Sequence, residues 1–182
     1  MKWIILQTSL LSLIILSLFL NLDFKSASSS LKQTADAPKI IEIQSPKWIV
    51  PQKDSNNIYK ISSQKAYLDI INKNIKLLQP DMNFIEKEQL VLKIISQKGE
   101  FQDQLSHLIF KGSAKFISYK NEYQIIGHAQ SMEFFPMKNL LIIKDSAILN
   151  HKNYLLEAEE IVIDTVSMEI LKSINPRMKA NT

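Results

Sequence analysis

Residues 59–84, YKISSQKAYLDIINKNIKLLQPDMNF, contain the pattern that decides the fold. The stretch divides into two expected β segments, Tyr59–Ile71 and Ile75–Phe84, on either side of the polar turn Asn72-Lys73-Asn74. In the second segment apolar side chains recur at every second position, which is the period of a strand with one buried face. Pro80 interrupts this segment, and because proline cannot donate to a sheet ladder it marks a break, a bulge or an edge. The stretch therefore predicts a β-hairpin with one apolar face.

The same hairpin pattern returns three times further along the chain. Tyr59, Ala66 and Ile75 are spaced seven and nine residues apart, and units of the same spacing begin at Leu92 and Tyr154. Another unit, with one inserted residue, begins at Tyr123. The four units begin 31–33 residues apart. A regular repeat of this length is typical of stacked copies of one supersecondary unit. Chance alignment of apolar residues in a β-rich chain is the other interpretation.

The clearest single strand is Leu108–Phe116, in which small or apolar residues occupy every second position. Polar turns separate such segments at intervals of about 8–12 residues, and no sustained helical period occurs after residue 39. These features predict an all-β fold of antiparallel hairpins, closed as a sandwich, barrel or jelly roll. We expect this domain to span residues 39–172 and to be followed by a disordered tail at 173–182.

The N-terminus has a different character. Trp3–Leu22 carries no charge, and 20 such residues in a helix would span about 30 Å, the thickness of a bilayer's hydrocarbon core. The expectation is a single transmembrane helix over residues 1–22, with a flexible tether at 23–38. The alternative is a cleaved signal peptide, cut near the small residues Ser26-Ala27-Ser28. Both interpretations export the β domain from the cytoplasm.

Composition excludes several kinds of site. The 182 residues include no Cys and 3 Gly, which removes thiolate metal sites, disulfides, cysteine nucleophiles and glycine-rich phosphate loops. His107, His128 and His151 lack partners at metal-ligand spacing, and Glu157, Glu159 and Glu160 fit the solvent face of a strand. The net charge of +4 comes from scattered lysines without interleaved aromatic residues. We therefore expect no enzyme, no cofactor, no metal and no nucleic-acid partner.

The apolar face of the repeats leaves two interpretations open. If the sheets close tightly, the face is only a core, and the protein is a structural component of the cell envelope. If the sheets stay splayed, the same face forms a groove for an apolar ligand such as an acyl chain. A stack of β repeats also ends in unpaired strands, which can accept a further strand from another chain.

Four motifs resemble those of the LptC family of lipopolysaccharide export proteins. They are Y-x-I-x-S-x-x-A at Tyr59–Ala66, L-x-x-P at Leu77–Pro80, L-x-F-x-G-x-A-x-F at Leu108–Phe116 and Y-x-L-x-A-x-x-I-x-I-D at Tyr154–Asp164. Together with the N-terminal apolar segment, the resemblance covers roughly residues 1–171. Gly127-His128-Ala129 with Met132 is similar to a stretch of the related soluble LptA proteins, which keeps that alternative open.

The resemblance implies a twisted, partly open antiparallel β jelly roll in the periplasm of a Gram-negative bacterium. It implies lipopolysaccharide as ligand, an inner-membrane ABC transporter (LptB, LptF and LptG) as donor and LptA as acceptor. The partner edges would be about Ile40–Val50 for the transporter and Ile161–Leu171 for LptA. Asp145 stands where relatives often have glycine. The residues expected to contact acyl chains are Ile61, Ile75, Leu77, Phe84, Ile94, Phe110, Phe116, Ile125, Phe134 and Ile143.

Overall fold

The computed structural model describes residues 40–51, 57–102, 106–120 and 124–180. Within these ranges the strands are antiparallel and join in one 14-stranded sheet, so the expected all-β class is confirmed. The helical structure described there is one short 3-10 helix, η2 (Pro136–Lys138), and no described helix is long and apolar enough to cross a membrane. The expected anchor at 1–22, tether at 23–38 and alternative cleavage position all lie outside the described residues.

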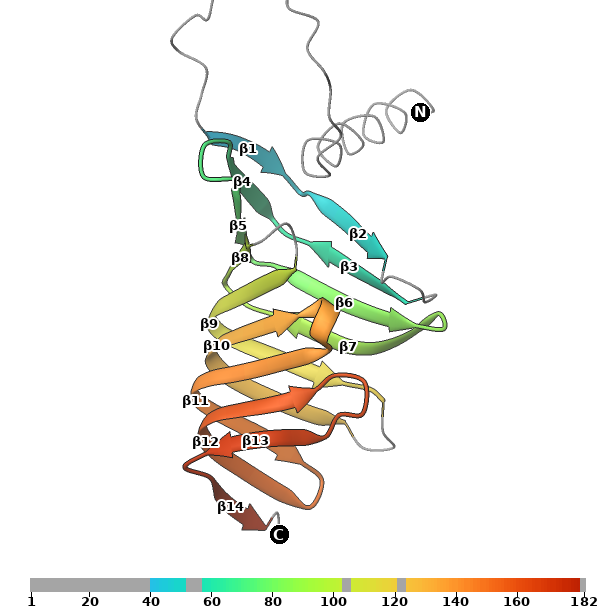
Figure 1. Cartoon of the computed structure of the whole chain (residues 1–182), viewed down its shortest axis with the longest axis vertical. Coiled ribbons are helices and arrows are strands. Elements are labelled where there is room, and N and C mark those ends of the chain that lie inside the picture. The colour runs from blue at the N-terminus through green and yellow to red at the C-terminus, as the bar shows by residue number, and fades with distance from the viewer. Residues whose placement is uncertain (1–39, 52–56, 103–105, 121–123, 181–182) are drawn as a thin grey trace, which may run out of the picture. The chain divides into compact units, whose positions relative to one another are not determined.

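The sheet forms two facing layers because its long strands bend near their middle, along one margin of the sheet (left in Figure 1). Four strands contribute one half to each layer: β9 (His107–Ser118), β10 (Ile125–Phe135), β11 (Leu140–His151) and β12 (Tyr154–Asp164). The first layer is completed by β2 (Lys47–Pro51), β3 (Ile58–Ser62), β6 (Asp81–Glu86), β7 (Gln89–Ile95) and β14 (Arg177–Ala180). The second layer is completed by β1 (Ile40–Gln44), β4 (Lys65–Asp69), β5 (Asn74–Leu78), β8 (Lys98–Gln102) and β13 (Ile170–Ile174).

The bends line up to form a corner, and the hairpin turns at the opposite ends of the strands form what we call the mouth. On every strand that returns from the second layer to the first, the corner contains a residue with positive φ, a backbone conformation that is costly for most L-residues. Asp145 is one of these, with φ 60°, which explains the glycine expected there in relatives. Ser146 (66°) follows it, and the other returning strands have Ser45 (48°), Gln79 (50°), Gly112 (75°) with Ser113 (52°), and Asn175 (51°).

Backbone hydrogen bonds continue across the corner. Ser45 N donates to Gln64 O at 2.9 Å, and Gln64 N donates to Leu78 O at 2.9 Å. One repeat later, Gln79 N donates to Gln97 O at 2.8 Å, and Gln97 N donates to Gly112 O at 3.1 Å. The bend therefore interrupts no ladder at these strands, and the two layers remain one continuous sheet.

The predicted repeat corresponds to one bent unit of this sheet. Tyr59 lies near the start of β3, Leu92 lies in β7 and Tyr154 starts β12, and each of these strands begins at the mouth in the first layer. Residue 123, the start of the remaining unit, lies outside the described residues, two positions before β10. Each unit then crosses the corner into the second layer and returns.

The predicted disordered tail at 173–182 is wrong for residues 173–180. β13 extends to Ile174, and β14 pairs with the first half of β12, with Tyr154 opposite Ala180 and Glu157 opposite Arg177. Pro176 suggested a frayed end, but it lies at the corner between these two strands, where a proline interrupts no ladder.

Replacing Gly127 with alanine tests the packing of the interior side chains of the first layer. A Cβ atom at this position would lie 1.9 Å from Cε1 of Phe116, whose ring is fully buried against the neighbouring strand. We expect Gly127→Ala to lower the free energy of unfolding by about 1–3 kcal/mol, because a large buried ring must move. Urea denaturation measures the change. Gln130→Ala, at an exposed position of the same strand, is the control and should change stability by less than about 0.5 kcal/mol; equal effects would contradict this packing.

Candidate functional site

The ten residues expected to contact an apolar ligand all face the space between the two layers. Every one is buried, with at most 7% of its surface exposed. The first layer contributes Ile61, Phe84, Ile94, Phe116 and Ile125. The second layer contributes Ile75, Leu77, Phe110, Phe134 and Ile143. The structure thus gathers them in one interior. Whether that interior accepts a ligand stays a prediction.

Aromatic side chains hold the layers together across this interior. The ring of Tyr59 in the first layer meets that of Phe134 in the second edge to face, with centroids 5.3 Å apart. Trp48 of β2 makes a similar contact with Phe101 of β8, also at 5.3 Å. Trp48 is thus a packing residue at this end of the sheet. The sequence did not single out Tyr59 as a site residue, although its place at the start of the repeat marks it as inward-facing.

The interior is closely packed in this conformation. A narrow cavity between the layers is lined by Val50, Tyr59, Ile61 and Met82 of the first layer and by Leu108 and Pro136 of the second, and it is too tight to admit a water molecule. Among the described residues, however, the backbone bonds run between neighbouring strands and across the corner, and none crosses the mouth. Side-chain contacts alone therefore close the mouth.

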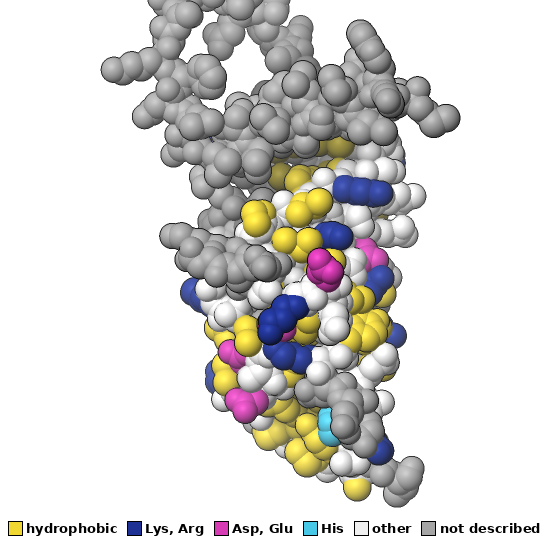
Figure 2. Space-filling view, turned by 90° about the vertical axis from the view of Figure 1, so that its right-hand side faces the viewer, with side chains coloured by type: hydrophobic (Ala, Val, Ile, Leu, Met, Phe, Trp, Pro, Cys, Tyr) yellow, Lys and Arg dark blue, Asp and Glu magenta, His cyan; other side chains and the backbone are white. Residues whose placement is uncertain are grey.

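Several apolar residues remain exposed on the turns around the mouth. Ile71 between β4 and β5 is 63% exposed, Met137 of η2 is 66% exposed, and Leu90 and Val166 are partly exposed. Figure 2, which faces the side on which η2 and the β12–β13 turn lie, shows apolar side chains at the surface between basic and acidic ones. The apolar character of the interior thus continues to the surface at the mouth.

Polar groups are few in the interior, and two hydroxyls there lack partners. The Tyr59 hydroxyl oxygen and the Thr165 Oγ1 are buried without a hydrogen-bond partner among the described residues. Burial raises the pKa of Tyr59 to about 12, so the phenol stays protonated at any physiological pH. A buried donor without an acceptor is costly in a folded protein and calls for an explanation.

Both ends of the sheet present strands that pair on one side only within the described ranges. At one end these are β1 and β2, as predicted for Ile40–Val50. At the other end the predicted edge, Ile161–Leu171, needs correction, because the second half of β12 pairs with both β11 and β13. The outer strands there are β13 and β14. Exposed apolar residues mark both ends: Ile40 (57%), Ile49 (65%), Leu171 (56%) and Met178 (67%).

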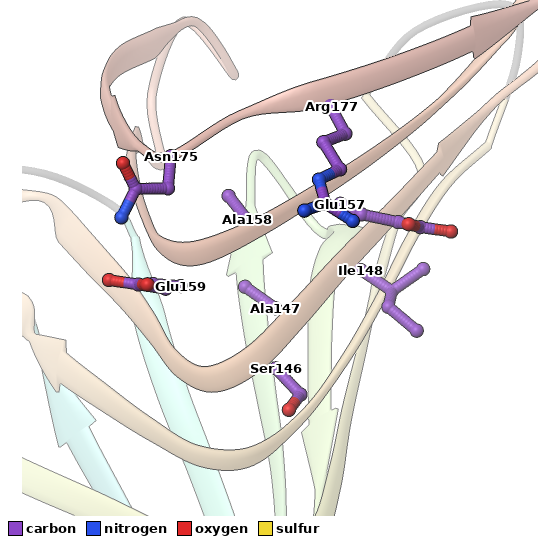
Figure 3. A pocket seen from close by; sticks show the side chains of 8 residues that line it. All are labelled: Ser146, Ala147, Ile148, Glu157, Ala158, Glu159, Asn175 and Arg177. Carbon is purple, nitrogen blue, oxygen red and sulfur yellow. The ribbon is translucent and has the colours of Figure 1, made fainter.

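A wide hollow of about 340 Å³ opens at the corner beside β14 (Figure 3). It lies where the ladders between β11, β12 and the last two strands skip residues. Small side chains form its centre, Glu157 and Arg177 point to one side, and Asn175 and Glu159 lie on the other. Glu157 is already paired with Lys179, with Nζ and Oε1 2.9 Å apart. No group of three His, Cys, Asp or Glu side chains in the described ranges could hold a metal.

A cluster of charged side chains connects three neighbouring strands on the outer surface of the second layer. Glu133 of β10 accepts a hydrogen bond from Lys144 Nζ of β11 at 2.8 Å, and its other oxygen lies 3.2 Å from His107 Nε2 of β9. Partial burial by itself would raise the pKa of Glu133, but the hydrogen bond and charge of Lys144, with those of His107, outweigh it and lower the pKa. The hydrogen bond to Glu133 raises the pKa of Lys144.

This cluster makes stability depend on pH in a defined direction. Because the pKa of Glu133 is lower in the folded state, its contribution is present above the ordinary glutamate range and is lost as pH falls through and below about 4. We expect Glu133→Gln to cost about 0.5–1 kcal/mol near pH 7 and much less near pH 3. Urea denaturation at both pH values measures the difference. Glu169→Gln, in an exposed turn, is the control; a Glu133→Gln cost that grows on acidification would contradict the assignment.

Comparisons with known proteins find a similar fold among solved structures. No family model matches the chain, and no curated protein matches it. A solved structure does: the crystal structure of LptH, described as the LptA homologous periplasmic component of the conserved lipopolysaccharide transport device from Pseudomonas aeruginosa. The match has a TM-score of 0.52 and 14% sequence identity and covers 68% of this chain and 94% of that chain. At this identity the likeness establishes a shared jelly-roll-like β fold.

Proposed function

We propose that this chain is a non-catalytic bridge protein of lipopolysaccharide export, which holds acyl chains between its two layers and passes the lipid to a neighbour. The observation that carries the proposal is the apolar interior, whose buried residues in the described ranges run from β3 and β4 to β12 and include no charged side chain. The shared fold with LptH, whose description names lipopolysaccharide transport, supports the same class of function.

An acyl chain matches this interior chemically. The lining consists of Leu, Ile, Met, Phe and small residues, and burial of each methylene in such surroundings contributes about 0.8 kcal/mol. Entry requires that the layers separate at the mouth, which would exchange side-chain contacts for contacts with the lipid. Since both sets of contacts are apolar, the net cost of the exchange is small compared with tearing a hydrogen-bonded ladder.

The two ends of the sheet fit the transfer of lipid between neighbours. A partner that adds a strand to β1 or β2, or to β13 or β14, would extend the ladder and bring its own interior into line with this one. We propose a donor at the N-terminal end, the transporter LptB, LptF and LptG of the resemblance, and an LptA-like acceptor at the C-terminal end. Exposed Leu171 and Met178 offer apolar contacts to such an acceptor.

The alternative is a structural envelope protein with a permanently closed core. The tight packing around Tyr59 and Leu108 is the observation that favours it. The two functions differ in one consequence: only the bridge brings lipid into contact with fully buried residues such as Phe134.

A photo-crosslinking residue at Phe134 distinguishes the two functions. With p-benzoylphenylalanine in place of Phe134 in the full chain, expressed in a Gram-negative cell, illumination should attach lipopolysaccharide to the protein, as detected by an antibody to lipid A. The same group at Lys111, an exposed position on β9, is the matched control and should give little adduct. Folded protein that gives no lipid adduct at Phe134, or gives equal adducts at both positions, would favour the closed core.

The finer role depends on whether residues 1–22 anchor the chain. We propose an uncleaved anchor, as in the LptC family, and therefore expect Met1 or Lys2 at the mature N-terminus and the chain in the inner-membrane fraction after alkaline extraction. N-terminal sequencing of the protein from cells measures this. A mature N-terminus near Ser29, with the protein in the soluble periplasmic fraction, would instead assign the LptA-like role.

A further inference from the structure

Tyr59 occupies a central place on the mouth side of the interior. It is the second residue of β3, close to where the strand leaves the mouth, and its ring stacks on Phe84 with centroids 4.7 Å apart. The same ring meets Phe134 of the opposite layer at 5.3 Å. Any separation of the layers at the mouth therefore breaks a contact of Tyr59.

The hydroxyl of Tyr59 has no role in the closed structure. The residue is 2% exposed, and its oxygen has no hydrogen-bond partner among the described residues. The other residues lining the cavity beside Tyr59 are all apolar: Val50, Ile61, Met82, Leu108 and Pro136. A phenylalanine would keep both ring contacts without the cost of an unsatisfied donor. The hydroxyl is thus explained only by an acceptor that arrives from outside.

We propose that the Tyr59 hydroxyl is a specificity-determining donor that bonds an oxygen near the head of a bound acyl chain, such as an ester carbonyl. This rests on the proposed function, since the acyl chain must first enter between the layers. The mouth-side position of Tyr59 fits this part of the lipid, because the chain points into the apolar interior while its oxygen-bearing end stays near the mouth. Pure hydrocarbon would leave the donor unsatisfied.

The variant Tyr59→Phe separates a binding role from a structural one. Without lipopolysaccharide, we expect its Tm to rise by about 2–4 °C, because an unsatisfied buried donor is removed. We expect its affinity for lipopolysaccharide to fall about three- to tenfold, which is the loss expected when one hydrogen bond is removed. Tyr119→Phe, at a partly exposed position, is the matched control and should change neither quantity.

The experiment uses the full chain in phosphatidylcholine nanodiscs, with p-benzoylphenylalanine at Phe110, which is in neither ring contact of Tyr59. Crosslinking to added lipopolysaccharide is titrated for the parent, Tyr59→Phe and Tyr119→Phe proteins. Methyl tetradecanoate and hexadecane, similar in length but with and without ester oxygens, then compete for the site. The ester should compete better than the alkane in the parent and lose that advantage in Tyr59→Phe. Thermal unfolding is followed by circular dichroism in the same nanodiscs without added lipopolysaccharide.

The outcomes keep the two proposals apart. Equal crosslinking of Tyr59→Phe and Tyr119→Phe, or a lower Tm for Tyr59→Phe, would overturn the role of Tyr59 and leave the bridge function standing. Failure of the parent protein itself to crosslink lipopolysaccharide at Phe110 would overturn the bridge function and, with it, the inference that depends on it.

Discussion

The alignment of the bends is the constraint on which the rest of the structure depends. Each strand of one continuous sheet must turn at the same level, or the backbone ladders on one side of the bend would lose their register. Positive-φ residues such as Asp145 and Gly112 allow the turn on returning strands, and bonds such as Gln64 N to Leu78 O carry the ladder through it. The two inner faces then meet because the corner leaves them no other partner.

The corner also makes the two sides of the fold unequal. At the corner the layers share a covalent backbone and its hydrogen bonds, whereas at the mouth they touch through side chains such as those of Tyr59 and Phe134. Apolar contacts depend little on direction and can be exchanged for contacts with another apolar group, while a broken ladder leaves unsatisfied donors and acceptors. A movement that opens the interior would therefore begin at the mouth and leave the corner intact.

Charged residues occupy the outer surfaces and connect neighbouring strands. Lys65 with Glu42, Lys93 with Asp81 and Lys144 with Glu133 each join adjacent strands, at 2.8 Å in all three pairs. Such pairs add little to stability when exposed, but like charges in these places would oppose the observed register. The described interior contains apolar residues and a few hydroxyl groups. The hydroxyl group of Tyr59 is among those that have no hydrogen-bond partner in the described residues.

The sequence by itself determined which face of the long strands is apolar, the repeat of 31–33 residues and the inward direction of all ten candidate residues. These properties follow from local spacing, because side-chain direction alternates along a strand. The sequence also contains a further signal: Ser-Gln-Lys at 63–65 and 96–98 marks two of the bends at the corner, where each serine hydroxyl donates to the lysine carbonyl.

Only the tertiary structure decided that strands bend, that Arg177–Ala180 pairs with β12 and that the C-terminal edge is β13 and β14. It also decided that the Tyr59 hydroxyl lacks a partner. Pairing between distant strands is made by backbone groups that every residue carries, so side-chain pattern alone cannot assign it.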